Sequence, residues 1–200
     1  DNYFLSAENP VANIDQRDLE AKALALLESP DMQRARTIVS LLWQNAMKHP
    51  AQDQWSRFDN AIDEYMFHQA LYGANGDPCY PQVLRIMEPP GHWFGQTVPG
   101  SRWGGDSPDF IYRIIPVEHG GQYRISGKTT CANPPTVTYS MVASGGAAPA
   151  TVAILDSLDM DVNDDGKFII TIDNTASENR KNHLQTKPGV DHIMVRDALG

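Results

Sequence analysis

The sequence has few cysteines and no long apolar run. Its 200 residues include only two cysteines, Cys79 and Cys131, and neither lies in a Cys-x-x-Cys or Cys/His spacing. Those spacings mark zinc and redox sites, so we predict no metal site and two free thiols, with a disulfide between them as the alternative. No apolar run approaches ~18 residues, the length that a membrane-spanning helix needs. The sequence therefore predicts no membrane contact.

Positive charge is also scarce. Lysine and arginine number 16 against 25 aspartate and glutamate residues, which gives a net charge of −9. Proteins that bind nucleic acids non-specifically cluster lysine and arginine to neutralise phosphates, so nucleic acid is excluded as a predicted partner. No motif calls for a cofactor, and no Gly-x-Ser-x-Gly motif places a nucleophile. Whether the protein is an enzyme stays open, as does its location, where the cytoplasm is expected over the periplasm.

Capping motifs and the spacing of apolar residues predict helices within residues 18–73. Ser29, Pro30 and Asp31 combine an N-cap hydroxyl, a proline in the first turn and an acid near the positive end of a helix dipole. From residue 52 to 72, apolar side chains recur at three- and four-residue steps, which indicates one further helix. We expect this apolar stripe to be buried against a β domain. Its members include Trp55, Phe58, Ile62, Tyr65 and Met66.

Residues 74–105 change character and are rich in proline and glycine. This stretch also carries His92, Trp93, Phe94 and Trp103. Aromatic side chains in a long connection either pack onto a core or line a pocket, and the sequence leaves both readings open.

A period of two begins at Phe110 and is typical of strands. If Val117 faces Gln122 across a turn at residues 118–121, then Tyr112 and Ile125 share a core-facing side. Further alternating or β-branched runs cover residues 136–143, 151–155, 168–172 and 192–196. Several strands joined by Gly, Pro and Asp turns predict an antiparallel β-sandwich or jelly roll. No βαβ alternation appears, so a parallel sheet is not expected.

The C-terminal half also carries a series of short motifs. In order they are Gly105-Asp106-Ser107-Pro108-Asp109 followed by Tyr112, Tyr123-Arg124-Ile125-Ser126-Gly127, Asp164-Asp165-Gly166-Lys167-Phe168, Asn182-His183-Leu184 with Pro188-Gly189, and Val195-Arg196. This half resembles the bacterial family known as "domain of unknown function 1214". The resemblance implies a jelly-roll-like β domain preceded by helices, and no assigned activity, cofactor or catalytic residue. It also implies that related proteins continue beyond the point matching Gly200.

A second motif resembles the opening of a calcium loop. Asp161, Asn163, Asp165 and Gly166 alternate oxygen ligands as calcium loops do. The twelfth position is Ile172 rather than glutamate, and Asp-Gly before a β run is itself a hairpin signal. We therefore predict a structural turn that needs no calcium.

Three arginines within apolar strands form the candidate site. Arg113, Arg124 and Arg196 would share one sheet face if their strands adjoin, and a guanidinium suits the binding of a carboxylate, sulfate or phosphate. The alternative is internal pairing with Asp106, Asp109 or Asp191. Asp106 and Asp109 also form a candidate acid–base pair, for which an ordinary turn is the alternative. The other candidate ligand-binding residues are Trp103 and His92.

We thus expect an α+β protein with residues 1–105 forming an arm, helices and an aromatic loop, and residues 106–200 forming an antiparallel β domain. The leading hypothesis is a soluble bacterial protein that binds a small organic acid or hydrophobic metabolite, with transformation of that ligand left open. Its cleft would lie between the loop at 92–103 and the arginine-bearing face. The alternative is a non-catalytic binding or assembly module, in which the polar arm at 1–17 contacts a second copy in a homo-oligomer.

Overall fold

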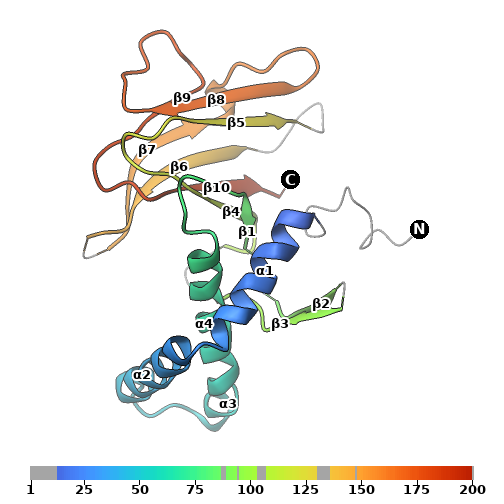
Figure 1. Cartoon of the computed structure of the whole chain (residues 1–200), viewed down its shortest axis with the longest axis vertical. Helices are drawn as coiled ribbons and strands as arrows, with labels where there is room; N and C mark the ends of the chain where they lie inside the picture. Colours follow the sequence, from blue (N-terminus) through green and yellow to red (C-terminus); the bar gives the residue numbers. More distant parts are fainter. Residues whose placement is uncertain are drawn as a thin grey trace. The chain divides into compact units, whose positions relative to one another are not determined.

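The computed structural model describes residues 13–86, 89–93, 95–102, 107–129, 136–146 and 148–199. Four helices in the N-terminal half are followed by mainly antiparallel sheets, which confirms the α+β class (Figure 1). Internal contacts divide the chain into two compact units. The helical unit comprises Asp1–Gly76 and Ile86–Asp106, and the β unit comprises Asp77–Arg85 and Ser107–Gly200. No helix among the described residues is long and apolar enough to cross a membrane.

Capping side chains stand at the start of two of the four helices, and the start at Ser29 and Pro30 is the one predicted. The helices are α1 (Ile14–Leu27), α2 (Pro30–Ala46), α3 (Gln52–Trp55) and α4 (Phe58–Ala74). The Asn13 side chain accepts a hydrogen bond from the Gln16 amide at the start of α1, and Ser29 Oγ accepts one from the Met32 amide at the start of α2. Each bond satisfies an amide that has no partner within its helix.

The apolar stripe predicted for residues 52–72 is only partly buried. Phe58, Ile62 and Met66 form a buried cluster with side chains of α1 and α2, and Ile62 is fully buried. Trp55, in contrast, is 41% exposed. The predicted single helix is two, because Ser56 follows α3 with its hydroxyl donating to Asp53 O and the chain turns before α4 begins at Phe58. Trp55 therefore lies on a separate short helix, outside the periodic stripe.

The stretch expected to be a long irregular loop contains a small hairpin. Its strands β2 (Gly91–Trp93) and β3 (Gln96–Val98) belong to the helical unit. A polar network ties β3 to α1, because Gln16 Nε2 and Gln96 Nε2 both donate to the buried Glu20 carboxylate, at 3.0 and 3.2 Å. The buried His68 of α4 similarly hydrogen-bonds Ser101 Oγ at 2.7 Å. These buried polar groups have partners, as buried polar groups must.

The β unit is built from two sheets. The five-stranded sheet has the order β1-β4-β10-β6-β7, and all its pairs are antiparallel. Its strands are β1 (Leu84–Arg85), β4 (Phe110–Pro116), β10 (His192–Ala198), β6 (Val137–Ala143) and β7 (Ala150–Asp156), with the 3-10 helix η2 (Ser157–Asp159) after β7. The three-stranded sheet has the order β5-β8-β9, in which β8 and β9 are parallel. These strands are β5 (Tyr123–Lys128), β8 (Lys167–Asp173) and β9 (His183–Gln185).

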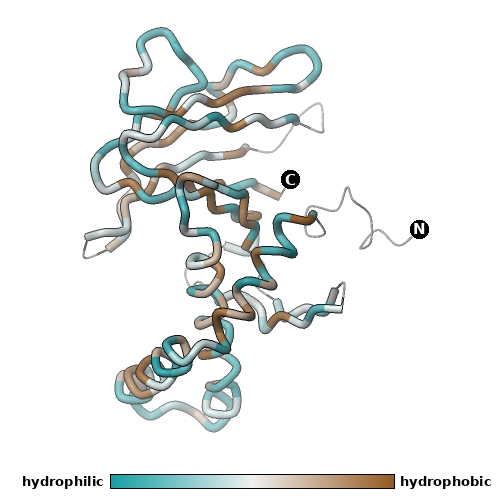
Figure 2. Tube along the Cα trace, in the orientation of Figure 1, coloured by the Kyte–Doolittle hydropathy of each residue, from teal (hydrophilic) through white to brown (hydrophobic). Residues whose placement is uncertain are grey.

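The hairpin predicted between β4 and β5 is wrong. β4 pairs with β1 and β10, whereas β5 pairs with β8 in the other sheet. The main core gathers residues from both sheets, including Ile115 and Val117 at the β4 end and Ile170 and Ile172 of β8. The face of β4 that contributes to this core is thus the one carrying Arg113 and Ile115, opposite to the predicted one. Hydrophobic residues occur on strands of both sheets (Figure 2).

Alternation could not identify that face, because β4 is buried on both sides. Tyr112 and Ile114 are 7% and 3% exposed, although they point away from Ile115. With both faces buried, the core-facing side of β4 was assigned only from the assumed pairing of Val117 with Gln122. That pairing does not form, because β5 pairs with β8.

Candidate functional site: a cleft beside strand β5

Two cavities of the β unit lie side by side along β5. They have volumes of about 350 and 610 Å³ and share the lining residues Val83, Ile115, Ile125 and Ser126. Because they share a wall, we describe them together as the β5 cleft, with a narrow part and a wide part. One side of the cleft is β5 and the other is formed by Val83 and residues of β4.

An ion pair lies in the narrow part. Arg113 of β4 donates from a guanidinium nitrogen to Asp197 Oδ2 of β10 at 2.9 Å. The two side chains are 25% and 30% exposed, so the pair is shielded from water on most sides without being sealed. A guanidinium has five N–H donors, and one bond to Asp197 leaves others for a ligand.

Tyr139 of β6 stands beside this pair. Burial raises the pKa of Tyr139 to about 12, an effect that Arg113 opposes and Asp197 reinforces. The phenol is therefore neutral near pH 7 and can donate a hydrogen bond. Within the described part of the chain its hydroxyl has no hydrogen-bond partner. The cleft thus offers a donor from Tyr139 next to the donors of Arg113.

The remaining wall of the narrow part is largely apolar. Its apolar side chains are Val83, Ile115, Ile125, Val137, Phe168 and Val195. The Phe168 ring covers Gly127 so closely that a Cβ atom at Gly127 would lie 2.2 Å from Phe168 Cζ. Phe168 also meets Tyr139 edge to face, with ring centroids 6.2 Å apart. Phe168 and aliphatic side chains therefore line the same cavity as the polar donors.

Positive charge exceeds negative charge around the narrow part. Arg113 lines it, and Asp197 is the one carboxylate among the described lining residues, whereas Lys128 lines it from β5 with its side chain on the outer face of that strand. Arg85 is the direct cross-strand partner of Arg113, so its side chain leaves the sheet on the same face. In a chain with a net charge of −9, this cluster is a local exception that suits an anion.

The three predicted arginines do not share one face. Arg113 pairs across strands with Val195, which lies in the core between the sheets. Arg196 follows Val195 and so points to the opposite face, where it donates to Ser140 Oγ at 3.2 Å. Arg124 lies on the other sheet but lines the wide part of the cleft. Two of the three arginines thus line the same cleft, and Arg196 is not among its lining residues.

Two other predicted residues, Asp109 and His92, are not among the lining residues of the cleft. Asp109 forms a turn with Ser107, because its amide donates to Ser107 Oγ at 3.3 Å, and it does not line the cleft. His92 is an exposed residue of the helical unit whose Nδ1 bonds Thr97 Oγ1 at 2.6 Å. Asp106 and Trp103 lie outside the described residues.

Two residues of the cleft, Tyr139 and Asp197, were not predicted from the sequence. Tyr139 falls in the alternating run predicted at residues 136–143, where its aromatic ring is typical of a buried strand position, and Asp197 directly follows Arg196. The signal available for Asp197 was a charged residue in phase with Ile193 and Val195, on the core side of β10.

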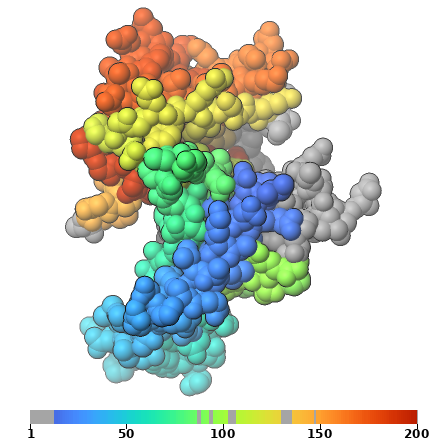
Figure 3. Space-filling model, in the orientation of Figure 1, coloured from blue at the N-terminus to red at the C-terminus, as the bar shows by residue number. Residues whose placement is uncertain are grey.

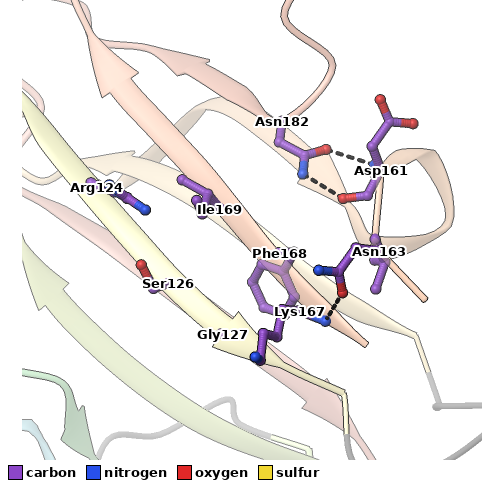
Figure 4. A pocket seen from close by; sticks show the side chains of 10 residues that line it. Arg124, Ser126, Gly127, Asp161, Asn163, Lys167, Phe168, Ile169 and Asn182 are labelled. Atoms are coloured by element: carbon purple, nitrogen blue, oxygen red, sulfur yellow. Dashed lines mark hydrogen bonds between the residues drawn. The ribbon is translucent and has the colours of Figure 1, made fainter. Parts of the chain in front are cut away.

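A third cavity, of about 640 Å³, lies beside β5 and β8, over the segment 161–163 (Figure 4). Asn182 braces this segment by accepting from the Asp161 amide at 2.8 Å and donating to Asp161 O at 2.7 Å. Asn163 Oδ1 accepts from the amides of Asp165 and Lys167 and so organises the turn itself. Among the described residues, no cluster of His, Cys, Asp and Glu is arranged to hold a metal ion.

Comparison with known proteins found similarity in the fold and none in the sequence families. No family model matches the chain, and no curated protein matches it significantly. A similar solved structure is that of an uncharacterised protein from Burkholderia cenocepacia, with a TM-score of 0.64 and 15% sequence identity. The match covers 90% of this chain and 47% of that one, so this chain spans about half the length of its structural neighbour. At this identity the likeness shows a shared fold alone.

Proposed function

We propose that the narrow part of the β5 cleft binds a small organic acid with a hydrophobic body. The observation that carries the proposal is that Arg113 and Tyr139 line one cavity whose other lining residues are mainly apolar. A carboxylate accepts hydrogen bonds from a guanidinium and from a phenol, and a charge-assisted bond to arginine is among the stronger ones. A volume of about 350 Å³ falls at the small end of ligand pockets.

Each lining residue has a role in this proposal. Arg113 and Tyr139 bind the carboxylate, and Asp197 holds the guanidinium in place through its 2.9 Å bond. Phe168 and the aliphatic residues contact the body of the ligand. This position differs from the cleft expected between the loop at 92–103 and the arginine-bearing face, since the described residues that line the β5 cleft all belong to the β unit.

We also propose that the C-terminal half belongs to the family known as "domain of unknown function 1214", on the strength of the ordered motifs from Gly105 to Arg196. The α+β fold of this chain is compatible with that assignment. It adds no activity to the proposal.

A binding screen tests the proposal. Benzoate, phenylacetate and short fatty acids would be titrated into the protein by calorimetry, with Arg113→Met and Arg196→Met variants in parallel. Arg113→Met should weaken binding at least about tenfold, as loss of a charge-assisted bond does. Arg196→Met should bind as the wild type does, because Arg196 lies on the other face. Equal losses in both variants, or no binding by any acid, would contradict the proposal.

A second candidate function is a non-catalytic assembly module. Ile38, Leu41 and Leu42 favour it, because they lie within one turn of α2 and are 57%, 61% and 61% exposed. Such a face can bury itself in a homo-oligomer. Sedimentation of the wild type and a Leu41→Lys variant tests this candidate: an oligomer that the substitution dissociates would support it, and a monomer at all concentrations would exclude it.

A further inference from the structure

Strand β5 is an edge strand with outward-facing backbone groups. Among the described residues its strand partner is β8, on one side. The Thr129 amide donates to Gly166 O at 2.8 Å, directly after the ladder ends. In an antiparallel ladder, residues bonded to the neighbour alternate with residues whose N–H and C=O groups point away. By this alternation the backbone groups of Arg124, Ser126 and Lys128 face the open edge.

The wide part of the cleft lies along this edge. It has a volume of about 610 Å³ and separates β5 from the segment at residues 78–83. That segment contributes Pro78 and Pro81, which have no backbone N–H to offer to a strand. Figure 3 shows the two regions on one face, β5 in yellow and the segment in green. The open edge of β5 therefore borders a cavity of the β unit.

The two faces of β5 differ in chemistry. Tyr123 and Ile125 pack toward the core, while Arg124, Ser126 and Lys128 take the outer face. Figure 4 shows Arg124 and Ser126 on β5, with Ile169 on the neighbouring strand. Within the described residues, Arg124 and Lys128 form no ion pair.

The positive charges of Arg124 and Lys128 favour an acidic partner strand. A chain paired with β5 would place its residues directly opposite Arg124 and Lys128, where acidic side chains are favourable and basic ones are not. Two copies of β5 paired antiparallel about Ser126 would bring Arg124 of each copy against Lys128 of the other. Like charges directly opposite destabilise a strand pair, so a second copy of this edge is disfavoured.

We propose that β5 docks an extended peptide in which acidic residues alternate with small apolar residues, and that this peptide adds a fourth strand to the three-stranded sheet. Its acidic side chains lie on the outer face beside Arg124 and Lys128. Its apolar side chains enter the wide part of the cleft. Backbone hydrogen bonds supply affinity and the alternating side chains supply specificity, as in other cases of strand addition. The inference goes beyond the proposed function, because Arg113 and Tyr139 take no part in it.

The test uses a fluorescently labelled eight-residue peptide that alternates glutamate with valine. A peptide of the same composition in blocks and a lysine–valine alternating peptide serve as controls. Binding to the full chain is followed by fluorescence anisotropy. A second readout is the rate at which Cys79 is alkylated in a Cys131→Ser background, because Cys79 is an exposed thiol that lines the wide part.

The decisive variant is Ser126→Pro, with Ser126→Ala as its matched control. Proline removes an amide that points away from β8, so the existing ladder keeps its bonds while the docking edge loses a donor. We expect the glutamate–valine peptide to bind, to slow Cys79 alkylation, and to bind Ser126→Pro roughly tenfold more weakly than Ser126→Ala.

If Ser126→Pro does not fold, the variant Arg124→Glu tests the same docking proposal. It should weaken the glutamate–valine peptide and strengthen the lysine–valine peptide, while Arg113→Met changes neither. Three results would overturn the proposal: no binding of the glutamate–valine peptide, equal binding of all three peptides, or wild-type binding by both edge variants. Dimerisation that Ser126→Pro abolishes would identify a second copy as the occupant and would also overturn it.

Discussion

At Gly127 the missing side chain leaves space that the Phe168 ring occupies. Gly127→Ala would place a Cβ 2.2 Å from the ring, so the ring must move out of its contact with Tyr139. We expect a loss of about 1–3 kcal/mol in the free energy of unfolding, as for other overpacked sites. Urea denaturation measures it. Gly145→Ala is the control, because a Cβ at Gly145 meets no atom within 4 Å, and a loss of similar size there would contradict this reading.

We expect the stability of the β unit at acid pH to depend on the Asp173 carboxylate. Its carboxylate accepts bonds from Arg180 and from the Thr175 amide, each at 2.8 Å, and these bonds hold the pKa of Asp173 well below its usual range. A depressed folded pKa contributes stability that is present above the unfolded pKa of about 4 and is lost as pH falls through the folded value.

Asp173→Asn should therefore flatten the fall of the melting temperature below about pH 4. Thermal unfolding across that range measures the effect. Asp164→Asn serves as the control, because the Asp164 side chain makes no hydrogen bond or ion pair with any described residue. If the melting temperatures of the wild type and Asp173→Asn fall in parallel with pH, the Asp173 carboxylate does not determine the loss of stability in acid.

At the scale of elements, α4 supplies the core of the helical unit. Ile62 is fully buried between Phe58 and Met66 and side chains of α1 and α2. Ile62→Ala should cost roughly 2–5 kcal/mol of unfolding free energy, the usual range for a buried isoleucine. Ile38→Ala removes the same atoms from a residue that is 57% exposed and should cost less than about 1 kcal/mol. Similar values for both, measured by chemical denaturation, would place Ile62 on the surface.

The turn between Asn163 and Lys167 is a second element with its own test. Asn163 Oδ1 bonds two amides of the turn, and the Gly166 amide donates to Asn163 O at 2.8 Å. Since backbone groups satisfy the Asn163 oxygens, we expect the melting temperature to be the same with and without a calcium chelator. A clear fall on chelation, restored by added calcium, would mean that the loop binds the ion.

Local elements were the most predictable part of the chain. The start of α2 follows from Ser29 and Pro30 because capping depends on residues within one turn. The break between α3 and α4 was missed, since the apolar spacing of Trp55 and Phe58 continues across it. The pairing of β5 with β8 was also missed, because Tyr123 and Ile172 are far apart in sequence and strand pairing is decided by the whole unit.

For the whole molecule, the sequence placed residues 74–105 with the helices, whereas contacts group Asp77–Arg85 with the β unit as the connection into β1. A two-residue strand has too little pattern to be recognised. The candidate site shows the same limit. Arg113 was identified by its charge in an apolar strand, but its partner Asp197 is 84 residues away. Only the antiparallel pairing of β4 with β10 brings the two together.

We propose above that Arg113 and Tyr139 bind a carboxylate inside the β5 cleft. Crystals soaked with para-bromobenzoate test it most directly, because the bromine gives an anomalous signal that locates the ligand. We expect a bromine peak beside Phe168, with the carboxylate about 3 Å from the Arg113 guanidinium and the Tyr139 hydroxyl. A bromine peak only outside the cleft, in crystals of a protein that binds the acid in solution, would contradict the claim.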